Sequence, residues 1–207
     1  MVHRRELDGT ELMFGVHGAL WGNAMTWWDH DTGSIWSQPI GEAIVGPRAG
    51  ARLELFPSTF TTWGAWRESY PDTIALDVPA GTTRFDLDGL LIVVDFTSDT
   101  SAYRVEDLRR IGVANDVVAG LEIAVVIDPE NPQRWSVFSR RLDATTVVLE
   151  IRGDALVDAG TGTTWDPVRG IGLAGPLAGE ILDLLPGFTS FPGDYPTFFP
   201  EGRIWQP

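Results

Sequence analysis

The chain contains neither cysteine nor lysine, and these two absences remove several kinds of chemistry. Without cysteine there are no disulfides, no thiolate zinc or iron–sulfur sites and no cysteine nucleophile. Without lysine there is no Schiff-base catalysis and no P-loop lysine to hold a phosphate. The Gly-x-Ser-x-Gly motif of many serine hydrolases is also missing. The motifs therefore assign no catalytic residue.

Positive charge and long apolar runs are also scarce. The chain has 15 basic against 29 acidic residues, a formal net charge of −14. Because nucleic acids and anionic membrane surfaces are bound through concentrated basic side chains, we expect neither as a partner. No stretch approaches the ~18 apolar residues of a membrane span, and the N-terminus lacks the pattern of a signal peptide. We expect a soluble protein without a membrane segment and assign no compartment.

The most informative feature present is an internal repeat. Residues 7–18 align with 142–153, and residues 29–57 align with 158–186. The matched residues of the first copy are Asp29, Thr32, Gly33, Trp36, Gly41, Gly46, Pro47, Ala49 and Gly50, and their partners are Asp158, Thr161, Gly162, Trp165, Gly170, Gly175, Pro176, Ala178 and Gly179. Two copies of one unit are therefore predicted.

The local pattern of each copy favours β structure. Apolar residues alternate with others at Leu12, Phe14 and Val16, and Asp8-Gly9 and Gly22-Asn23 are typical hairpin turns. We predict a mostly β protein of two tandem related β-rich units, small-barrel or sandwich-like, with one or two short helices. The expected division is a truncated first unit at 1–77, a linker at 78–87 and a complete second unit at 88–207.

Short helices are predicted at 61–71 and at 105–110. In the first, Trp63, Trp66 and Tyr70 share one side of the helix, which ends at Pro71. We expect these aromatic rings to be core residues that pack on a sheet, because aromatic stripes are usually buried. The alternative is a platform on which carbohydrate stacks. The tail, 192–207, holds four prolines among aromatic residues and is expected to be irregular but packed.

Several motifs in this order and spacing resemble one known family. They include the segments 32–38, 41–44, 57–59 and 61–63 of the first copy and 174–179 of the second. The chain resembles the bacterial and archaeal family called domain of unknown function 3179, from about Arg4 to Ser190. The resemblance implies a β-rich duplication and no established reaction. It also implies an N-terminal truncation to about one and a half repeats, without the upstream histidine and cysteine motifs of the family.

Histidines cluster in the first 30 residues and suggest a metal site. If Gly22-Asn23 form a two-residue turn, His17 faces Trp28 and Gly15 faces His30, so that the two histidines lie diagonally on one face. Asp29 and Asp31 flank His30. Such a set would suit a divalent metal, namely zinc, manganese or iron. The alternative is a surface His17 beside Trp28 and a His30 that belongs to the following turn.

The pairing around Asp8-Gly9 sets the third histidine, His3, opposite Phe14, on the other face of the sheet from His17. A three-histidine site is therefore not expected. The site residues predicted from the sequence are His17, His30, Asp29 and Asp31 as metal ligands, and Trp21, Trp27 and Trp28 as the wall of an apolar pocket.

Two functions from different classes follow from the sequence. The first is a hydrolase of a small ester or phosphoester, in which the metal activates a water molecule. The second is a non-catalytic binding or assembly module, in which the open sheet edge left by the missing half-repeat recruits a partner strand. The expected partner is accordingly a small-molecule substrate or a protein, including a second copy of this chain bound through the open edge.

Overall fold

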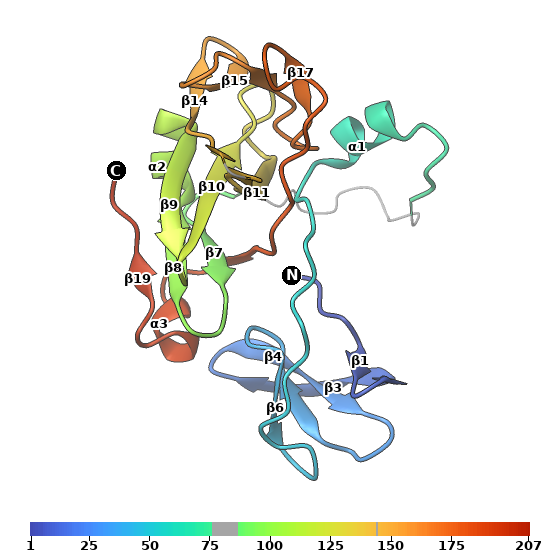
Figure 1. Ribbon diagram of the computed structural model, residues 1–207. Helices are drawn as coiled ribbons and strands as arrows, with labels where there is room; N and C mark the ends of the chain where they lie inside the picture. The colour runs from blue at the N-terminus through green and yellow to red at the C-terminus, as the bar shows by residue number, and fades with distance from the viewer. Residues whose placement is uncertain (76–86, 144) are drawn as a thin grey trace.

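The computed structural model describes residues 1–75, 87–143 and 145–207 (Figure 1). These residues form a mostly β fold with several sheets and three short helices, which confirms the predicted class. None of the described sheets closes into a barrel, so the small-barrel expectation is wrong, and the helices outnumber the expected one or two. The predicted linker, 78–87, lies outside the described residues except for Leu87. No helix of the described residues is long and apolar enough to cross a membrane.

The N-terminal part of the chain forms a hairpin and then a four-stranded antiparallel sheet, called here the first sheet. Both predicted turns are present: Asp8 and Gly9 have φ of 51° and 75°, and Gly22 and Asn23 have φ of 56° and 66°. A two-residue hairpin turn needs positive φ at both central residues. The strands are β1 (Glu6–Leu7) and β2 (Thr10–Glu11) in the hairpin, and β3 (Phe14–Trp21), β4 (Ala24–Asp29), β5 (Ile35–Ser37) and β6 (Glu42–Val45), which are neighbours in that order.

The central part of the chain contributes strands and a helix to two packed sheets, one of which is buried on both faces. Its elements are β7 (Leu91–Asp95), β8 (Thr100–Arg104), α2 (Val105–Ile111), β9 (Val113–Val118), β10 (Leu121–Ile127) and β11 (Trp135–Ser139). Strand β10 is the middle strand of the β11-β10-β9 sheet. Its Ile123 and Val125 pack toward β7, β8 and α2, while the alternate residues Ala124 and Val126 pack on the next sheet. Burial on both faces explains why β10 is almost continuously apolar.

Another four-stranded sheet, called here the second sheet, covers the other face of the β11-β10-β9 sheet. After the hairpin strands β12 (Arg141–Leu142) and β13 (Thr145–Thr146) come β14 (Leu149–Arg152), β15 (Ala155–Asp158), β16 (Thr164–Trp165) and β17 (Gly172–Ala174). Their order, β14-β15-β16-β17, repeats that of the first sheet. A register shift falls at Ile35/Trp36 in the first sheet and at the aligned pair Thr164/Trp165 in the second.

The tail is more regular than expected. It contributes β18 (Phe188–Ser190) beside β7, the short helix α3 (Tyr195–Phe198), and β19 (Arg203–Ile204) in parallel with β8. The Tyr195 hydroxyl donates to the main-chain oxygen of Arg203 at 3.1 Å. Long-range pairing with β7 and β8, rather than any local pattern, orders this proline-rich segment.

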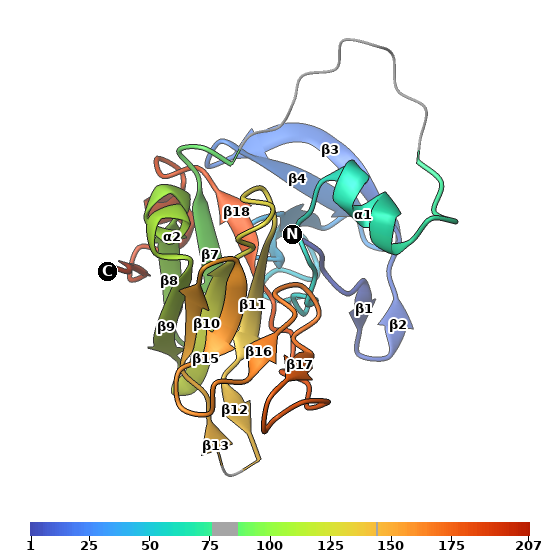
Figure 2. The ribbon, with the colours of Figure 1, turned by 90° about the horizontal axis from the view of Figure 1, so that it is seen from above.

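Helix α1 (Trp63–Ser69) is present where predicted and begins at Thr62, whose hydroxyl accepts from the main-chain N–H of Ala65. Its aromatic rings are not core residues. Trp63, Trp66 and Tyr70 keep 44%, 37% and 44% of their surface exposed. Figure 2 shows α1 at the border of the molecule, and Trp66 and Tyr70 line a pocket together with residues of the segment that joins β16 and β17. A helix placed at a border buries only part of such a stripe, which overturns the expected core packing.

Candidate functional site

The β3–β4 hairpin carries most of the predicted site residues, and its register departs from the prediction. Next to the turn, Trp21 pairs with Ala24, as the two-residue turn requires. A β-bulge between Val16 and Leu20 then shifts the pairing along the rest of the hairpin. Gly18 lies inside this bulge with a φ of 83°, a conformation that favours glycine.

As a result, Gly15 pairs with Trp28, and the predicted pairs of Gly15 with His30 and of His17 with Trp28 are wrong. The rings of Trp28 and His30 stack on each other, with centroids 4.3 Å apart and an angle of 5° between their planes. A Cβ added to Gly15 would lie 2.5 Å from Nε1 of Trp28 and 3.3 Å from Nε2 of His30. A glycine is therefore required beneath this stacked pair.

His17 has a different partner. Its Nδ1 lies 3.0 Å from the hydroxyl oxygen of Thr26, and that hydroxyl donates to the main-chain oxygen of Ala19 at 2.7 Å. Thr26, Trp28 and His30 alternate along one face, so Thr26 and His30 are roughly 13 Å apart at the rise of a strand. The two histidines thus share a face, but Trp28 separates them.

Asp29 anchors a turn in the core. It is fully buried and accepts hydrogen bonds from the main-chain N–H of Thr32 at 2.7 Å and from Nε1 of Trp36 at 2.9 Å. The Nη1 atom of Arg48 lies 3.0 Å from its Oδ1. Burial by itself would raise the pKa of Asp29, but the hydrogen bonds from Trp36 and Thr32 and the charge of Arg48 outweigh it and lower the pKa. The oxygens of this carboxylate are already committed to structural contacts.

The remaining predicted residues are not gathered around Asp29. Asp31 is half-exposed and lies 3.5 Å from Nη2 of Arg48. Among residues 1–75, 87–143 and 145–207, no group of three or more His, Cys, Asp or Glu side chains is placed to hold a metal ion. The predicted ligands therefore do not form one cluster, because the bulge separates the histidines and the Asp29 carboxylate is bound within the core.

The three tryptophans of the predicted wall have different neighbours. Trp27 meets the ring of His3 edge-on at 5.6 Å, whereas Trp28 stacks on His30. Neighbouring residues of a strand point to opposite faces, so Trp27 and Trp28 cannot line one pocket. Trp21 contacts Phe198 of α3, with ring centroids 5.4 Å apart. The single wall that we expected is not formed.

The end of the β3–β4 hairpin makes a contact with α3 that the sequence did not indicate. The Asn23 amide donates to Oδ1 of Asp194 at 3.2 Å. A Cβ added to Gly22 would lie 2.8 Å from Cζ of Phe198. The aligned hairpin of the second sheet turns at Gly153, so the extra residues of the first hairpin are what reach α3. The tip of the β3–β4 hairpin therefore connects the first sheet to α3.

His3 is also placed differently from the prediction. It bridges to Leu55 rather than facing Phe14. Its Nε2 lies 2.9 Å from the main-chain oxygen of Gln38, and its buried Nδ1 has no partner in the described part of the chain. Burial lowers the pKa of His3 and thus favours the neutral ring, with the proton on Nε2. His3 packs on the sheet in the place that Phe138 takes on the second sheet.

The clearest structural difference between the first and second sheets lies at their outer edge strands, β3 and β14. In the second sheet, the edge strand β14 lies beside β9 (Figure 1), and a side chain of β9 binds its main chain. The Asn115 amide donates to the main-chain oxygen of Leu149 at 2.7 Å and accepts from its N–H at 3.0 Å. One side chain thus replaces a paired residue of a neighbouring strand and satisfies both main-chain groups of Leu149.

The aligned residue of the first sheet, Phe14, has no such clamp. Phe14 pairs with Asp29, whose N–H donates instead to Ser34 on the β5 side. Opposed residues of an antiparallel ladder exchange either both hydrogen bonds or neither, so the N–H and C=O of Phe14 point away from β4. No hydrogen bond to these two groups is found in the part of the chain that the structure describes.

The side chains beside this edge are correspondingly less covered. Leu149 and Leu156, on the second sheet, are each 1% exposed, because β9 and β10 pack on them. Their counterparts Phe14 and Trp27 are only partly buried, and Val16 is 68% exposed. An uncovered apolar strip therefore runs along β3 beside the open edge.

The comparisons with known proteins agree with the motifs of the first unit. Residues 1–91 match the family described as "Protein of unknown function (DUF3179)", a range that includes the first sheet and α1 and ends at Leu91 of β7. No curated protein and no solved structure matches this chain. The resemblance stated from the motifs is thereby confirmed for residues 1–91, which match the DUF3179 family of proteins of unknown function.

Proposed function

We propose that this protein is a non-catalytic binding module, whose first sheet receives a β-sheet element of a partner along β3. The observation that carries the proposal is the contrast between Leu149, clamped by Asn115, and the unclamped Phe14. A partner that resembles β9 and β10 fits this surface, because the second sheet already binds such an element. On this proposal the two sheets are copies of one unit, and only one copy has its covering strands within the described chain.

The chemistry of the proposed partner follows from the way in which β9 and β10 cover the second sheet. An asparagine amide closes the main chain of the edge, and Val113, Ala124 and Val126 supply the apolar face. A glycine is needed next to them, because a Cβ on Gly112 would lie 2.2 Å from Cγ1 of Ile151. Val16 aligns with Ile151, so the partner should offer a similarly small residue there.

The composition of β3 supports an interaction with a strand. Its eight residues, Phe14–Trp21, include no charged side chain and no proline, although the chain as a whole has a net charge of −14. Edge strands that must avoid pairing usually carry such residues. The aligned strand β14 is shorter and carries Glu150 and Arg152, even though its edge is already closed. The bulge around Gly18 confines the open pairing segment to Phe14 and Val16.

The metal-assisted hydrolase hypothesis has less support. The four predicted ligands do not form a cluster in the described residues, and Asp29 is occupied by the contacts of its own turn. Metal analysis of untagged protein tests it directly, with His17→Ala and His30→Ala alongside. We expect no stoichiometric ion. An ion that is lost in both variants, together with ester hydrolysis lost in both, would establish the hydrolase and overturn the binding module.

The binding proposal can be tested with a peptide made from this chain. A fluorescently labelled peptide of residues 113–127, which spans β9 and β10, is titrated into the full chain and followed by anisotropy. We expect saturable binding, and at least tenfold weaker binding of the same peptide with Asn115→Ala. In the protein, Val16→Glu should abolish binding, because it places a charge in the apolar strip.

The matched control is Val45→Glu, on β6 at the opposite edge of the same sheet, where Val45 is 59% exposed. This variant should bind the peptide as the unchanged protein does. Equal effects of the two glutamates, or no binding at all, would overturn the proposal. Light scattering completes the test: a dimer that Val16→Glu dissociates would make a second copy the partner, in place of an element built like β9 and β10.

A further inference from the structure

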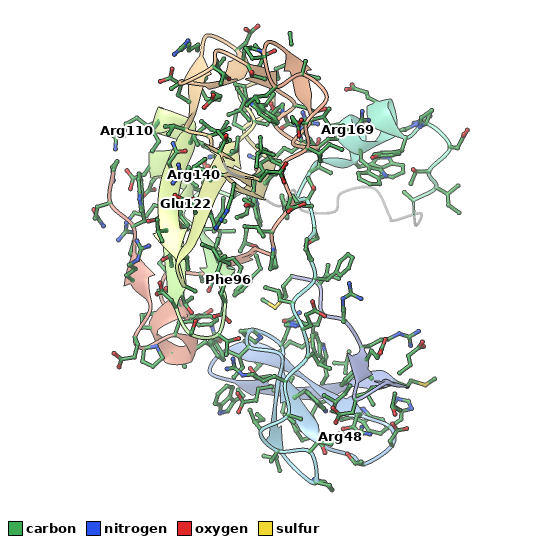
Figure 3. All side chains as sticks on the ribbon, viewed as in Figure 1. Arg48, Phe96, Arg110, Glu122, Arg140 and Arg169 are labelled. Atoms are coloured by element: carbon green, nitrogen blue, oxygen red, sulfur yellow. The ribbon has the colours of Figure 1, made fainter. Side chains whose placement is uncertain are left out.

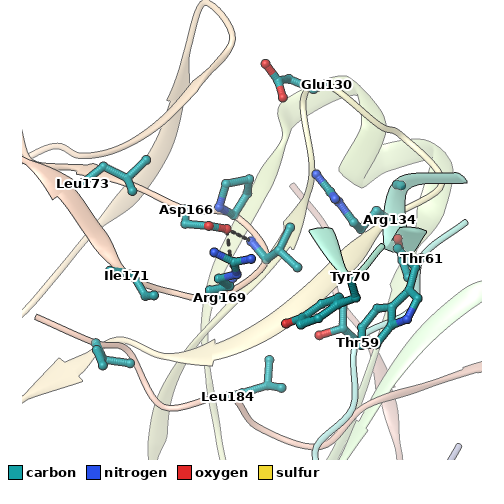
Figure 4. A pocket seen from close by; sticks show the side chains of 15 residues that line it. Thr59, Thr61, Tyr70, Glu130, Arg134, Asp166, Arg169, Ile171, Leu173 and Leu184 are labelled. Carbon is teal, nitrogen blue, oxygen red and sulfur yellow. Dashed lines mark hydrogen bonds between the residues drawn. The ribbon is translucent and has the colours of Figure 1, made fainter. Parts of the chain in front are cut away.

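A second feature, independent of the first sheet, is a cavity of about 700 Å³ between α1 and the second sheet. Trp66 of α1 and Tyr70, the residue that follows the helix, line one side, and the turn that contains Asp166 and Arg169 lines the other. Figure 4 shows Tyr70 and Arg169 converging on the same space, with Leu184 beside them. The volume lies within the range of small-molecule sites, roughly 300–1,000 Å³. We call this space the α1 cavity.

The aromatic side of the α1 cavity is held in place. The rings of Trp66 and Tyr70 stack with centroids 4.3 Å apart, and Nε1 of Trp66 donates to the Thr73 hydroxyl at 3.2 Å. Both rings nevertheless remain more than one third exposed. A fixed and exposed aromatic face binds the C–H groups of a flat ligand, because the ring face carries negative charge density.

The polar side of the cavity offers donors and acceptors in balanced number. Arg169 forms no ion pair within the described ranges, so its guanidinium can donate to a ligand, and it lies beside α1 (Figure 3). Asp166 uses Oδ1 for the N–H groups of Val168 and Arg169, at 2.8 and 2.9 Å, which leaves its other oxygen as an acceptor. Glu130 adds a second carboxylate. Each hydroxyl of a ligand needs both kinds of group.

The lining carries no excess of basic charge. Arg134 is paired with the buried Asp128, which leaves Arg169 facing two carboxylates, Asp166 and Glu130. A site for an anion would show an excess of basic side chains. One guanidinium donor and two carboxylate acceptors instead suit a ligand that is rich in hydroxyl groups.

We propose that the α1 cavity binds a neutral saccharide, with one sugar ring stacked on the outer face of the Trp66–Tyr70 pair and its hydroxyls bound by Arg169, Asp166 and Glu130. This site lies on the second sheet and α1, away from β3, and it does not depend on the partner proposed for β3.

The test uses the full chain and three soluble probes, maltohexaose, cellohexaose and chitohexaose, with binding measured by calorimetry. We expect at least one probe to bind, with at least tenfold weaker binding after Trp66→Ala and after Arg169→Ala. Trp66→Tyr should restore most of the affinity, because it keeps an aromatic face. Trp63→Ala is the matched control, since Trp63 is exposed on the same helix but does not line the cavity.

Circular dichroism checks that each variant is folded. Absence of binding to all three probes would overturn the proposal. Equal weakening by Trp63→Ala and Trp66→Ala would do the same, because it would place the saccharide outside the cavity. Phenylacetate is titrated in parallel: if it binds through Arg169 while the saccharides do not, the cavity is an anion site.

Discussion

The first and second sheets use the same turn and differ in what surrounds it. In each sheet a buried aspartate, Asp29 or Asp158, accepts from the N–H and the hydroxyl of a threonine three residues later. That threonine hydroxyl also meets a second hydroxyl, of Ser34 at 2.6 Å or of Thr163 at 2.8 Å. The shared network explains why Asp, Thr and Gly recur at these aligned positions.

The other partners of the aspartate differ. Asp29 is bound by Nε1 of Trp36 and faces Arg48, whereas Asp158 is bound by the main-chain N–H of Val148. The aligned indole nitrogen, Nε1 of Trp165, finds no partner among the described residues. The less covered first sheet thus closes its turn with charged and polar side chains. The second sheet lies under β9 and β10 and places Leu177 where the first has Arg48.

The largest expected effect comes from removing the aspartate. Asp29→Ala should lower the free energy of unfolding by about 3–5 kcal/mol, because Arg48 then lacks its buried partner. Asp158→Ala leaves only neutral donors unpaired and should cost about 2 kcal/mol. Urea denaturation of both variants measures the difference. Asp31→Ala, which removes a half-exposed carboxylate, is the control, and equal costs at positions 29 and 158 would contradict the contrast.

A smaller difference is expected from the tryptophans. Trp36→Phe loses a hydrogen bond to a charged carboxylate, while Trp165→Phe loses ring volume without any hydrogen bond. Trp36→Phe should therefore cost more, by about 1.5–3 kcal/mol, the range for a hydrogen bond to a charged group. Thermal unfolding of the two variants under one set of conditions measures which substitution lowers the stability more. Equal stabilities would mean that the Trp36–Asp29 bond contributes nothing net.

The smallest expected change is in the acid range. The pKa of Asp29 and that of Asp158 are lowered in the folded state, because hydrogen bonds outweigh the effect of burial. Stability from each carboxylate is present above its unfolded pKa, about 3.9, and is lost as the pH falls through the lower folded pKa. Asp29→Asn and Asp158→Asn should each flatten the fall in unfolding free energy below about pH 4. If the dependence of unfolding free energy on pH below about pH 4 is unchanged in both variants, this explanation is contradicted.

Local features of the sequence predicted the parts of the fold that depend on a few neighbouring residues. The turns at Asp8-Gly9 and Gly22-Asn23 are where expected, because their positive φ is a property of the residues themselves. Helix α1 begins after Thr62 for a similar reason, since a threonine hydroxyl caps the first turn. The bulge at Gly18 was missed, although its glycine is visible, because a glycine in a strand does not reveal how far the register shifts.

The candidate sites depended on contacts between distant segments. Asn115 lies in β9 and clamps a strand 34 residues away in the sequence, a contact that no pattern around residue 115 indicates. The aromatic stripe of α1 predicted a buried helix, and its exposure followed only from the position of α1 beside the second sheet. Neither the Asn115 clamp nor the exposure of α1 can be read from the local periodicity of the sequence.

The sequence alone determined that this protein is mostly β, where its tight hairpins turn, and that one pattern of Asp, Thr, Trp and Gly occurs twice. These features rest on backbone preferences and short-range hydrogen bonds, which act within a few residues. Only the tertiary structure decided that the second copy is covered by β9 and β10 while β3 keeps an open edge. Coverage depends on which distant strands reach a surface, and similar local patterns cannot specify that difference.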